Sequence, residues 1–456
     1  MHSAIGALRR LGSWPAAPLV LLAVVSVLSL GARCLLLDEP CQSPCTQSGD
    51  HALIFDEAYY VNAARVIAGI RPAPGAHYAD APLGTDPNAE HPQGVKLVMA
   101  AAIELFGDGP FAWRIGSILM GSIAILGMFA LVRSAGAGRW SALCASTLMA
   151  CDNLTLVHSR IGTLDIYVVA MMIWGIALYL RGHPLLAGLA LAVGCCFKEV
   201  GLYALPVLAL IELGHVLLRR RDRSSPAHWS PGISLARLLA ASSVMIVAFL
   251  ALLEIMDAIA TPYADSEAKL ITGGPFDHLA HIFSYAANLT SPHGPQGIAS
   301  YPWQWLIDLQ PIVYLRISAS LPHALDATHP VVDFLGMVSP PILLLAMPAL
   351  AVCLYRLARR RTPDSGRSAA DQELALLGVA WFFGTWTIFE AQSALDSRTS
   401  YLYYMVVVMP GIYVAVSYLV ALGWRRRNRW LSGLTALWAL SVFVAVVVMY
   451  PFVALF

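Results

Sequence analysis

Residues 401–423 read YLYYMVVVMPGIYVAVSYLVALG and contain no charged side chain. A run of this length and composition is long enough to cross the hydrocarbon core of a bilayer as one helix, which takes about 20 apolar residues. The triplet Arg425-Arg426-Arg427 follows almost directly, and Arg398 stands just before the run. This stretch therefore predicts a transmembrane helix with most of its flanking positive charge at one end.

The rest of the chain has the same character. Of its 456 residues, 58% are hydrophobic and only 12% are charged, whereas soluble globular proteins carry about 25% charged residues. The net charge of +1 gives no reason to expect nucleic acid or another bulk electrostatic partner. We therefore expect an all-α polytopic membrane protein with a single transmembrane domain over residues 1–456. Its hydrophobic runs predict eleven spans, near residues 17–37, 111–132, 140–157, 162–180, 184–197, 200–218, 236–256, 331–355, 373–391, 401–423 and 430–453.

The placement of arginine predicts the orientation of these spans, because cytoplasmic segments of membrane proteins are enriched in positive charge. A cytoplasmic N-terminus gives arginine to every cytoplasmic segment, and eleven spans then leave the C-terminus outside. We interpret the first run as a retained helix rather than a signal peptide, since it is long and lacks a clear cleavage site. Two long loops, about 38–110 and 257–330, face outward in this scheme, the second in place of a large soluble domain. The cytoplasmic arginines are Arg9, Arg10, Arg133, Arg139, Arg181, Arg219, Arg220, Arg221, Arg223, the cluster from Arg356 to Arg361, Arg425, Arg426, Arg427 and Arg429.

The first outer loop contains two adjacent carboxylates, Asp56 and Glu57, in the run FDEAYY. An isolated Asp-Glu pair is most often a solvated acidic turn. Here the pair lies beside a membrane surface, in a chain that is mostly membrane. A carboxylate at that place could take the proton from an acceptor hydroxyl as the hydroxyl attacks a substrate.

The predicted topology gathers further charged residues on the same outer face. Charged groups inside or at the rim of hydrophobic spans are costly and suggest function. All three lysines of the chain are on this side, while cytoplasmic positive charge is carried by arginine alone. The residues gathered at the outer rim are Asp56, Glu57, His91, Lys96, Arg160, Asp165, Lys198, Glu199 and Arg398.

The cations of this set also have simpler interpretations, which the residues alone leave open. Arg160 and Asp165 could form an ion pair at a helix start, or Arg160 could bind a lipid phosphate through its planar guanidinium. Lys198 could extend to the interface or pair with Glu199, or it could bind phosphate. Arg398 could hold a phosphate or anchor a helix at the interface.

Other outer-loop motifs concern the membrane surface. His91 opens the segment HPQGVK, which we interpret as the start of a helix lying in the interface. His293 is followed by Trp303 and Trp305, and paired tryptophans at this position favour an aromatic belt over a sugar-stacking surface.

The eight cysteines divide by location. Cys41 and Cys45 lie close together in the first outer loop, an oxidising compartment, so a local disulfide is expected. A metal site is less favoured there, because no further cysteine and no suitably spaced pair of histidines lies nearby.

Together these motifs resemble the protein O-mannosyltransferase family (glycosyltransferase family 39) and its bacterial relatives that depend on lipid carriers, which are membrane glycosyltransferases of the GT-C type. The matching segments occur in family order: FDE at 55–57, HPQGVKL at 91–97, LVHSRIGTLD at 156–165, FKEVGL at 197–202, and the loop from SPH at 291–293 to PWQW at 302–305. Three features depart from the family pattern. The usual HPPLGK reads HPQGVK, the late Tyr-His-Tyr reads YLYY at 401–404, and the second outer loop is too short for the MIR domain of eukaryotic members.

The resemblance implies a GT-C fold in the inner membrane of a bacterium. It implies transfer of a hexose, mannose foremost, from a polyprenyl-phosphate sugar to a hydroxyl at the outer face, with protein Ser/Thr as the leading acceptor. Asp56 is then the general base of an inverting displacement, and Glu57 orients it or binds the acceptor. We expect Arg160, Lys198 and Arg398 to bind the donor phosphate.

The expected site has further members and one open question about a cofactor. Some GT-C relatives hold a divalent metal at the acidic site, but the ligand set here is sparse, so we assign no metal ligand and leave a divalent metal as an open alternative. The residues expected to support the substrate site are His91, Lys96, Asp165, Glu199, His293, Trp303 and Tyr404.

Two alternatives stay open. An enzyme of the same kind could move another lipid-linked sugar to a glycolipid or a cell-wall polymer. A transporter of a lipid-linked substrate is an alternative from another class, but it should show repeat symmetry and polar groups at mid-membrane depth. The sequence contains no evident repeat, and its polar groups are predicted at one rim.

Overall fold

The computed structural model describes residues 14–41, 46–222, 225–317, 332–359, 368–426 and 428–449. Some residues that enter the sequence predictions lie outside these ranges, namely Arg9, Arg10, Cys45, Arg223, Arg360, Arg361 and Arg427.

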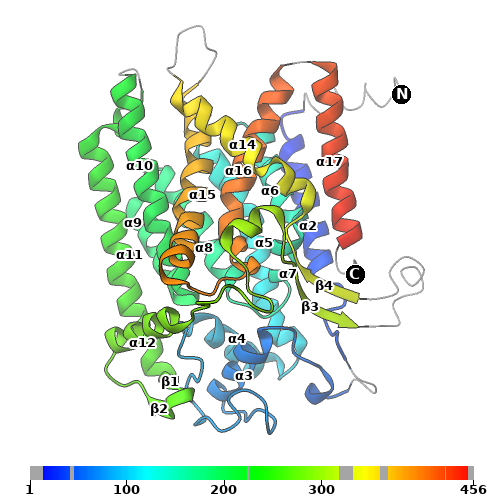
Figure 1. Ribbon diagram of the computed structural model, residues 1–456, viewed down its shortest axis with the longest axis vertical. Helices are drawn as coiled ribbons and strands as arrows, with labels where there is room; N and C mark the ends of the chain where they lie inside the picture. Colours follow the sequence, from blue (N-terminus) through cyan, green and yellow to red (C-terminus); the bar gives the residue numbers. More distant parts are fainter. Residues whose placement is uncertain are drawn as a thin grey trace.

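A bundle of long helices makes up most of the molecule, and shorter elements lie at its lower end (Figure 1). Each predicted span overlaps one of the long helices. They are α2 (Ala17–Cys34), α5 (Pro110–Ser134), α6 (Arg139–Cys151), α8 (Asp165–Leu180), α9 (Pro184–Phe197), α10 (Ala204–Arg221), α11 (Pro231–Ile259), α14 (Pro340–Ala358), α15 (Ala369–Asp396), α16 (Met405–Arg425) and α17 (Arg429–Met449). The shorter elements are α3 (Glu57–Ile67), α4 (Gly94–Phe106), α7 (Asn153–His158), α12 (Pro275–Asn288), and the strand pairs β1 (Tyr263–Ala264) with β2 (Lys269–Leu270) and β3 (Ile312–Ile317) with β4 (Val332–Gly336).

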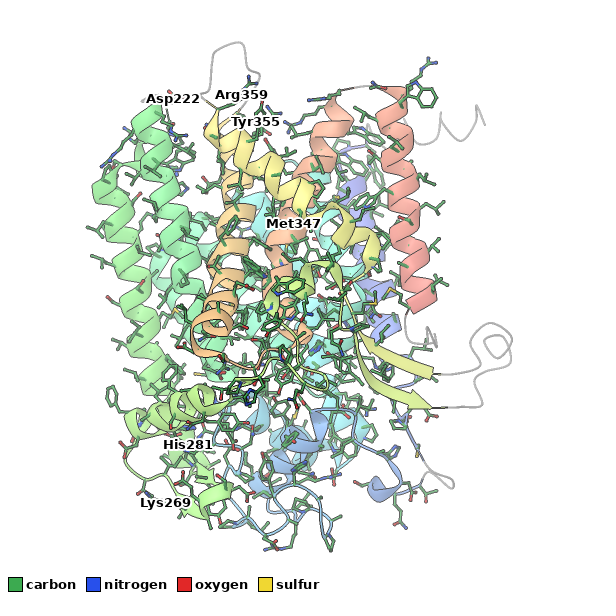
Figure 2. The ribbon with its side chains drawn as sticks, in the orientation of Figure 1. Asp222, Lys269, His281, Met347, Tyr355 and Arg359 are labelled. Atoms are coloured by element: carbon green, nitrogen blue, oxygen red, sulfur yellow. The ribbon has the colours of Figure 1, made fainter. Side chains whose placement is uncertain are left out.

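The helices have the lengths and composition of membrane spans. Among the described residues, eight helical segments are long and apolar enough to cross a bilayer, and α8 and α9 are shorter apolar helices. The chain is therefore a multi-pass membrane protein. The total of eleven crossings and the orientation of the termini stay predictions. Figure 2 places Arg359 at one end of the bundle and Lys269 at the other, the ends that the predicted orientation assigns to the cytoplasm and the exterior.

The uncharged run after Arg398 becomes the central helix α16 (Figure 1). In this segment 78% of the most apolar window is buried within the protein, against 6% for α17. Helices in lipid associate through close packing at small residues. A Cβ at Gly411 of α16 would press on backbone atoms of Gly378 and Phe382 in α15. Glycine at this position therefore allows the two helices to approach closely.

The predicted span 331–355 begins too early. Its first residues form strand β4, which pairs antiparallel with β3, and α14 starts only at Pro340. Apolar content alone does not distinguish a short buried strand from the start of a buried helix. The boundary is set by Ser339 and the two prolines that follow it, because proline is favoured in the first helical turn.

Two other predicted boundaries also shift. The span 140–157 divides at Asp152, whose carboxylate accepts hydrogen bonds from the backbone N–H and hydroxyl of Thr155 at 3.1 and 2.9 Å. This cap starts the separate helix α7. The interfacial helix expected from His91 starts at Gly94, and the residues before it form a loop.

Candidate active site

A cavity of about 510 Å³ lies where four segments of the outer loops meet. The predicted first outer loop contributes Phe55, Asp56, Tyr59, Tyr60, Asn88, Glu90 and His91, and the α9–α10 turn contributes Lys198, Glu199, Val200, Leu202 and Tyr203. The remaining sides come from α12 with Phe283, Tyr285 and Ala286, and from the end of α15 and the loop after it with Phe389, Gln392, Arg398, Tyr401, Tyr403 and Tyr404. Six of the residues expected at the site line this cavity: Asp56, His91, Lys198, Glu199, Arg398 and Tyr404.

Asp56 occupies a turn that leaves its carboxylate available to the cavity. Phe55 has a left-handed backbone with φ of +53°, and Asp56 is the residue that precedes α3. An aspartate at this position usually caps its helix, but Asp56 makes no cap hydrogen bond. Burial raises the pKa of Asp56 to about 7, with Asp165 adding to the rise and Lys198 and His91 opposing it. Such a carboxyl can accept a proton near neutral pH.

Lys198 has the largest effect on this carboxyl among its charged neighbours in the cavity wall. Its ammonium donates to Asp165 at 2.7 Å and lies over the rings of Tyr404 and Tyr403, 5.3 and 5.7 Å from their centroids. Burial opposes its charge, but Asp165 and other neighbours outweigh burial and raise the pKa of Lys198. The lysine is therefore a fixed positive charge, and Asp165 holds it in place from behind.

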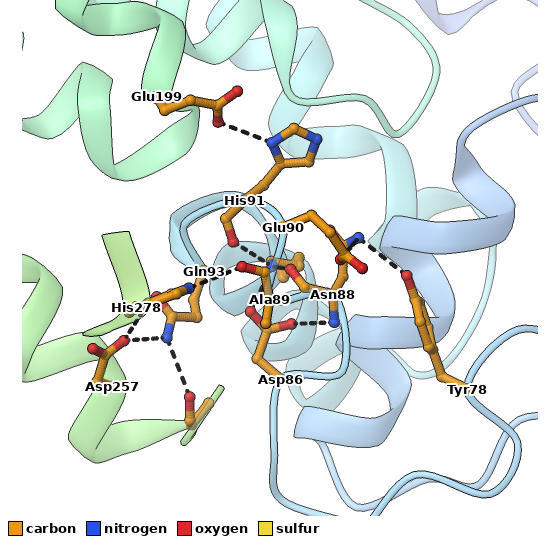
Figure 3. Close-up of polar contacts among 12 residues, drawn as sticks. Tyr78, Asp86, Asn88, Ala89, Glu90, His91, Gln93, Glu199, Asp257 and His278 are labelled. Atoms are coloured by element: carbon orange, nitrogen blue, oxygen red, sulfur yellow. Dashed lines mark hydrogen bonds and ion pairs between the residues drawn. The ribbon is translucent and has the colours of Figure 1, made fainter. Parts of the chain in front are cut away.

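His91, Glu199 and Arg398 complete the charged lining. The Nδ1 atom of His91 lies 2.9 Å from the Glu199 carboxylate (Figure 3). Arg398 donates through Nη1 to the carbonyl of Ala286. Its buried Nε has no hydrogen-bond partner among the described residues. The charged and titratable lining of the cavity thus comprises the carboxylates of Asp56, Glu90 and Glu199, the cations Lys198 and Arg398, and the imidazole of His91.

Glu57 does not line the cavity with its neighbour. It accepts two hydrogen bonds of 2.8 Å from Arg114, and others from the backbone of Ile54 and Gly162. Glu57 and Arg114 are both fully buried. The expectation that Glu57 binds the acceptor is therefore replaced by a supporting role, since every acceptor position of its carboxylate is directed into the protein. Arg114 was not among the site residues expected from the sequence, although an arginine inside an apolar run is a signal of a functional or structural role.

Two expected cations are also absent from the cavity lining. Arg160 donates to the carbonyl of Leu36 at 2.8 Å, and its guanidinium lies 4.3 Å from the centroid of the Phe334 ring. Lys96 is fully buried and donates to Asp86 and to the carbonyls of Asn88 and His91. Both belong to the outer rim by position, but folding directs them toward the protein interior rather than toward the cavity.

The segment HPQGVK has Gln93 where the family pattern HPPLGK has proline, and this difference has a structural consequence. Gln93 donates to the Asp257 carboxylate of α11 at 2.6 Å, and His278 of α12 contacts the same oxygen at 2.8 Å (Figure 3). A proline at position 93 would lack this donor. The glutamine therefore ties the first outer loop to the helices that begin the second outer loop.

The remaining expected residues lie apart from the cavity. His293 is exposed, and Trp303 is 46% exposed and stacks on Tyr301. Cys41 is disulfide-bonded, and because Cys45 lies outside the described residues their pairing stays a prediction. Among the described residues, no group of three or more His, Cys, Asp or Glu side chains could hold a metal ion.

Aromatic residues that the sequence analysis did not select form much of the wall. Tyr60 and Tyr403 line the cavity beside Asp56, and Phe389 lines it while stacking on the expected Tyr404, with ring centroids 5.2 Å apart. Their signal was the density of tyrosine around the charged motifs, in FDEAYY and YLYY. At a membrane rim that pattern is also typical of interface anchors, so it did not identify a site.

Comparison with known proteins connects this geometry to a family. Residues 90–252 match the model of a family described as dolichyl-phosphate-mannose-protein mannosyltransferase. The chain is 22% identical over 450 residues to a polyprenol-phosphate-mannose–protein mannosyltransferase of Mycolicibacterium smegmatis, covering 87% of this chain and 80% of the relative.

Solved structures share the fold. The protein O-mannosyltransferase Pmt1-Pmt2 complex of S. cerevisiae, bound to its sugar donor, matches with a TM-score of 0.70 and 11% identity over 95% of this chain and 90% of that chain. ArnT from Cupriavidus metallidurans, bound to undecaprenyl phosphate, matches with a TM-score of 0.50 and 18% identity over 89% of this chain and 60% of that chain. The family match, the bacterial relative and the shared fold together confirm the resemblance of this chain to the protein O-mannosyltransferase family.

Proposed function

We propose that this protein is a glycosyltransferase that moves mannose from a polyprenyl-phosphate donor to a hydroxyl of a protein Ser or Thr. One observation carries the proposal: Asp56, Lys198 and Arg398 all line the same cavity. The donor class and the acceptor follow the relative from Mycolicibacterium smegmatis, which is a polyprenol-phosphate-mannose–protein mannosyltransferase.

The proposed reaction is one displacement with inversion at the anomeric carbon. The acceptor oxygen forms a bond to that carbon as the bond from carbon to the phosphate oxygen breaks. The hydroxyl proton passes to the carboxylate of Asp56, and the polyprenyl phosphate leaves with the bonding electrons. A carboxyl with a pKa of about 7 is matched to this task, since it is partly ionised at neutral pH and holds the proton it receives.

Lys198 and Arg398 stabilise the departing phosphate in this proposal. Negative charge grows on the phosphate oxygen during bond cleavage, and fixed cations in a site shielded from water stabilise such charge strongly. Lys198 is held by Asp165, and Arg398 has a buried Nε without a partner among the described residues. Arg160 is left out of this role because it does not line the cavity.

The position of the cavity fits a lipid-linked donor. Its walls come from the outer loops of the predicted topology, so a donor moving sideways in the bilayer would reach the charged groups at the membrane surface. We therefore place the reaction at the outer face of the bacterial inner membrane. This placement rests on the arginine distribution and on the outer-loop origin of the lining residues.

A reconstituted assay tests the proposal. Purified protein in liposomes receives polyprenyl-phosphate mannose and a Ser/Thr-rich peptide, and mass spectrometry follows a hexose added to the peptide. Asp56→Asn protein of equal thermal stability is the matched control. Transfer by the wild type and its loss in the variant are expected. Transfer only to glycolipid acceptors would replace the proposed acceptor, and wild-type protein that transfers no sugar from any polyprenyl-phosphate donor would contradict the reaction.

A further inference from the structure

Strand β3, which pairs with β4, contacts the residue that precedes the proposed base. Tyr314 of β3 stacks on Phe55 with ring centroids 4.3 Å apart. Tyr403 packs against the edge of the same Phe55 ring at 5.6 Å. Tyr314 is only 7% exposed and does not line the cavity. It therefore contacts the turn that presents Asp56 from behind, without access to a bound substrate.

The hydroxyl of Tyr314 makes a second contact, with the LVHSRIGTLD segment. It lies 2.8 Å from Nε2 of His158. On the other side of the ring, Nδ1 lies 3.4 Å from the Thr163 hydroxyl oxygen and 3.7 Å from Asp165. Thr163 donates its own proton to the carbonyl of His158, so its oxygen can accept from Nδ1. The arrangement favours a neutral His158 with its proton on Nδ1, so that the Tyr314 hydroxyl donates to the unprotonated Nε2.

This chain of contacts ends at the phosphate-facing lysine. Asp165 accepts the 2.7 Å hydrogen bond from Lys198, and the His158 ring stacks on Tyr403, which also lies beneath the Lys198 ammonium. Burial lowers the pKa of His158 to about 4, which keeps the ring neutral at the working pH. One continuous set of contacts therefore runs from Phe55 through Tyr314, His158 and Asp165 to Lys198.

A glycine on the facing strand makes room for this tyrosine. Gly336 of β4 stands opposite Ile312 of β3, and a Cβ at Gly336 would overlap the Tyr314 ring and hydroxyl. The ring therefore has its present place only if position 336 lacks a side chain. This is a second element, independent of the hydrogen bond, that fixes the same phenol.

We propose that Tyr314 and His158 are positioning residues that hold the turn bearing Asp56 in register with Lys198. The inference rests on the proposed function, in which these two groups act on opposite sides of the reacting carbon. A base and a leaving-group cation must be correctly placed at the same time, and small displacements of such groups lower the rate steeply. The β3–β4 strand pair thus takes part in the reaction without touching the substrate.

The test compares Tyr314→Phe, which keeps the stacked ring and removes only the hydroxyl, with Tyr355→Phe, which removes a hydroxyl from a 55% exposed tyrosine at the other end of the bundle (Figure 2). We expect Tyr314→Phe to lower kcat about three- to tenfold, the fold-change of one lost hydrogen bond, while the donor KM stays near wild type. Tyr314→Ala should lower kcat further, and Gly336→Ala should reproduce the loss from the facing strand. Tyr355→Phe should match the wild type.

The pH profile separates positioning from general loss of structure. The charged groups that shift the pKa of Asp56 are Lys198, Asp165 and His91, and all of them are kept in Tyr314→Phe. The phenols of Tyr60, Tyr314 and Tyr403 also interact with Asp56, and the substitution removes only the neutral hydroxyl of Tyr314. A loosened turn admits water to Asp56, so the apparent pKa of the base should fall in this variant.

Three outcomes would overturn the inference: a folded Tyr314→Phe protein with wild-type kcat and pH profile, a lower rate with an unchanged profile, or an equal loss in Tyr355→Phe. An inactive wild type would instead reject the proposed function, so the two failures can be told apart.

Discussion

At the scale of single residues, the environment of Asp56 distinguishes it from its acidic neighbour. The two carboxylates are adjacent in sequence, yet Asp56 lines the cavity and Glu57 is enclosed by Arg114 and backbone donors. Burial without a dedicated partner raises the pKa of Asp56. The chemical difference between the two groups therefore comes from their partners and not from the residue types.

The substitution Asp56→Asn should remove the general base while it keeps the shape of the side chain. We expect Asp56→Asn to lower kcat by roughly 10²–10⁴, the usual contribution of general base catalysis, with donor binding retained. Asp80→Asn, at an exposed position of the same loop, is the matched control. The measurements are turnover and donor affinity in liposomes, with thermal stability checked first. A stable Asp56→Asn protein with near wild-type turnover would exclude Asp56 as the base.

The raised pKa of Asp56 sets the direction of the pH dependence. Below about pH 7 the carboxyl is mostly protonated and cannot accept the acceptor proton, so kcat/KM should rise with pH and level off above about 7. The loss on the acidic side should approach tenfold per pH unit. A pH–rate series under conditions of constant folding measures this. A rate independent of pH between about 5.5 and 8 would argue against a base with this pKa.

Lys198 and Arg160 were both expected to bind the donor phosphate, but their alanine variants should now have different effects. Lys198→Ala removes the charge in the cavity wall, so we expect a higher donor KM or a lower kcat, equivalent to about 1.5–3 kcal/mol for a charge-assisted contact. Arg160→Ala removes an internal contact instead, so it should lower the melting temperature with donor kinetics near wild type. Kinetics and thermal melts of both variants distinguish the roles. If both variants are stable and show equal kinetic losses, Arg160 would again be assigned to binding of the donor phosphate.

At the scale of elements, Glu57 joins segments that are distant in sequence. Its carboxylate connects the start of α3 to Arg114 of α5 and to the backbone at Gly162, which precedes α8. A buried ion pair of this kind need not add net stability, but removing one partner leaves the other charge buried and unpaired. The pair therefore fixes where the base-bearing turn sits on the helix bundle.

Glu57→Gln should consequently act on stability more than on chemistry. We expect the free energy of unfolding to fall by about 3–5 kcal/mol, the usual cost of leaving a buried partner uncompensated. Thermal melts in detergent with wild type and Glu104→Gln, a change in α4, measure the loss. Any fall in turnover should follow the fraction of folded protein. Unchanged stability combined with a large loss of kcat would instead favour direct action of Glu57 in the reaction.

At the scale of the whole molecule, the two ends of the bundle have different chemistry. Arg359 lies at one end, while Lys269 and α12, which helps to line the cavity, lie at the other (Figures 1 and 2). A single membrane orientation therefore places the whole candidate site on one side of the bilayer, and the proposed reaction needs it to be the outer side.

Labelling of introduced cysteines tests that orientation. On a Cys34→Ser background, which removes an exposed free thiol, we compare Lys269→Cys with Arg359→Cys, both at exposed positions at opposite ends (Figure 2). A membrane-impermeant maleimide should label position 269 in intact cells and position 359 only after permeabilisation. The reverse pattern would invert the topology and place the cavity in the cytoplasm.

The sequence by itself determined the class of fold and the general place of the site. Apolar runs such as 401–423 specify helices wherever lipid requires internally satisfied backbone groups, and the motifs around Asp56, His91, Lys198 and Arg398 are local enough to recognise. Only the tertiary structure decided which polar groups face the cavity. Glu57, Lys96 and Arg160 have the residue types and rim positions of ligands, but each is held by an internal partner. Arg114 and Leu36, the partners of Glu57 and Arg160, come from other segments, whereas Lys96 pairs with Asp86 of its own loop. The contact of Tyr314 with Phe55 joins loops more than 250 residues apart in the chain. Such pairings depend on how helices pack, and no periodicity along the sequence encodes them.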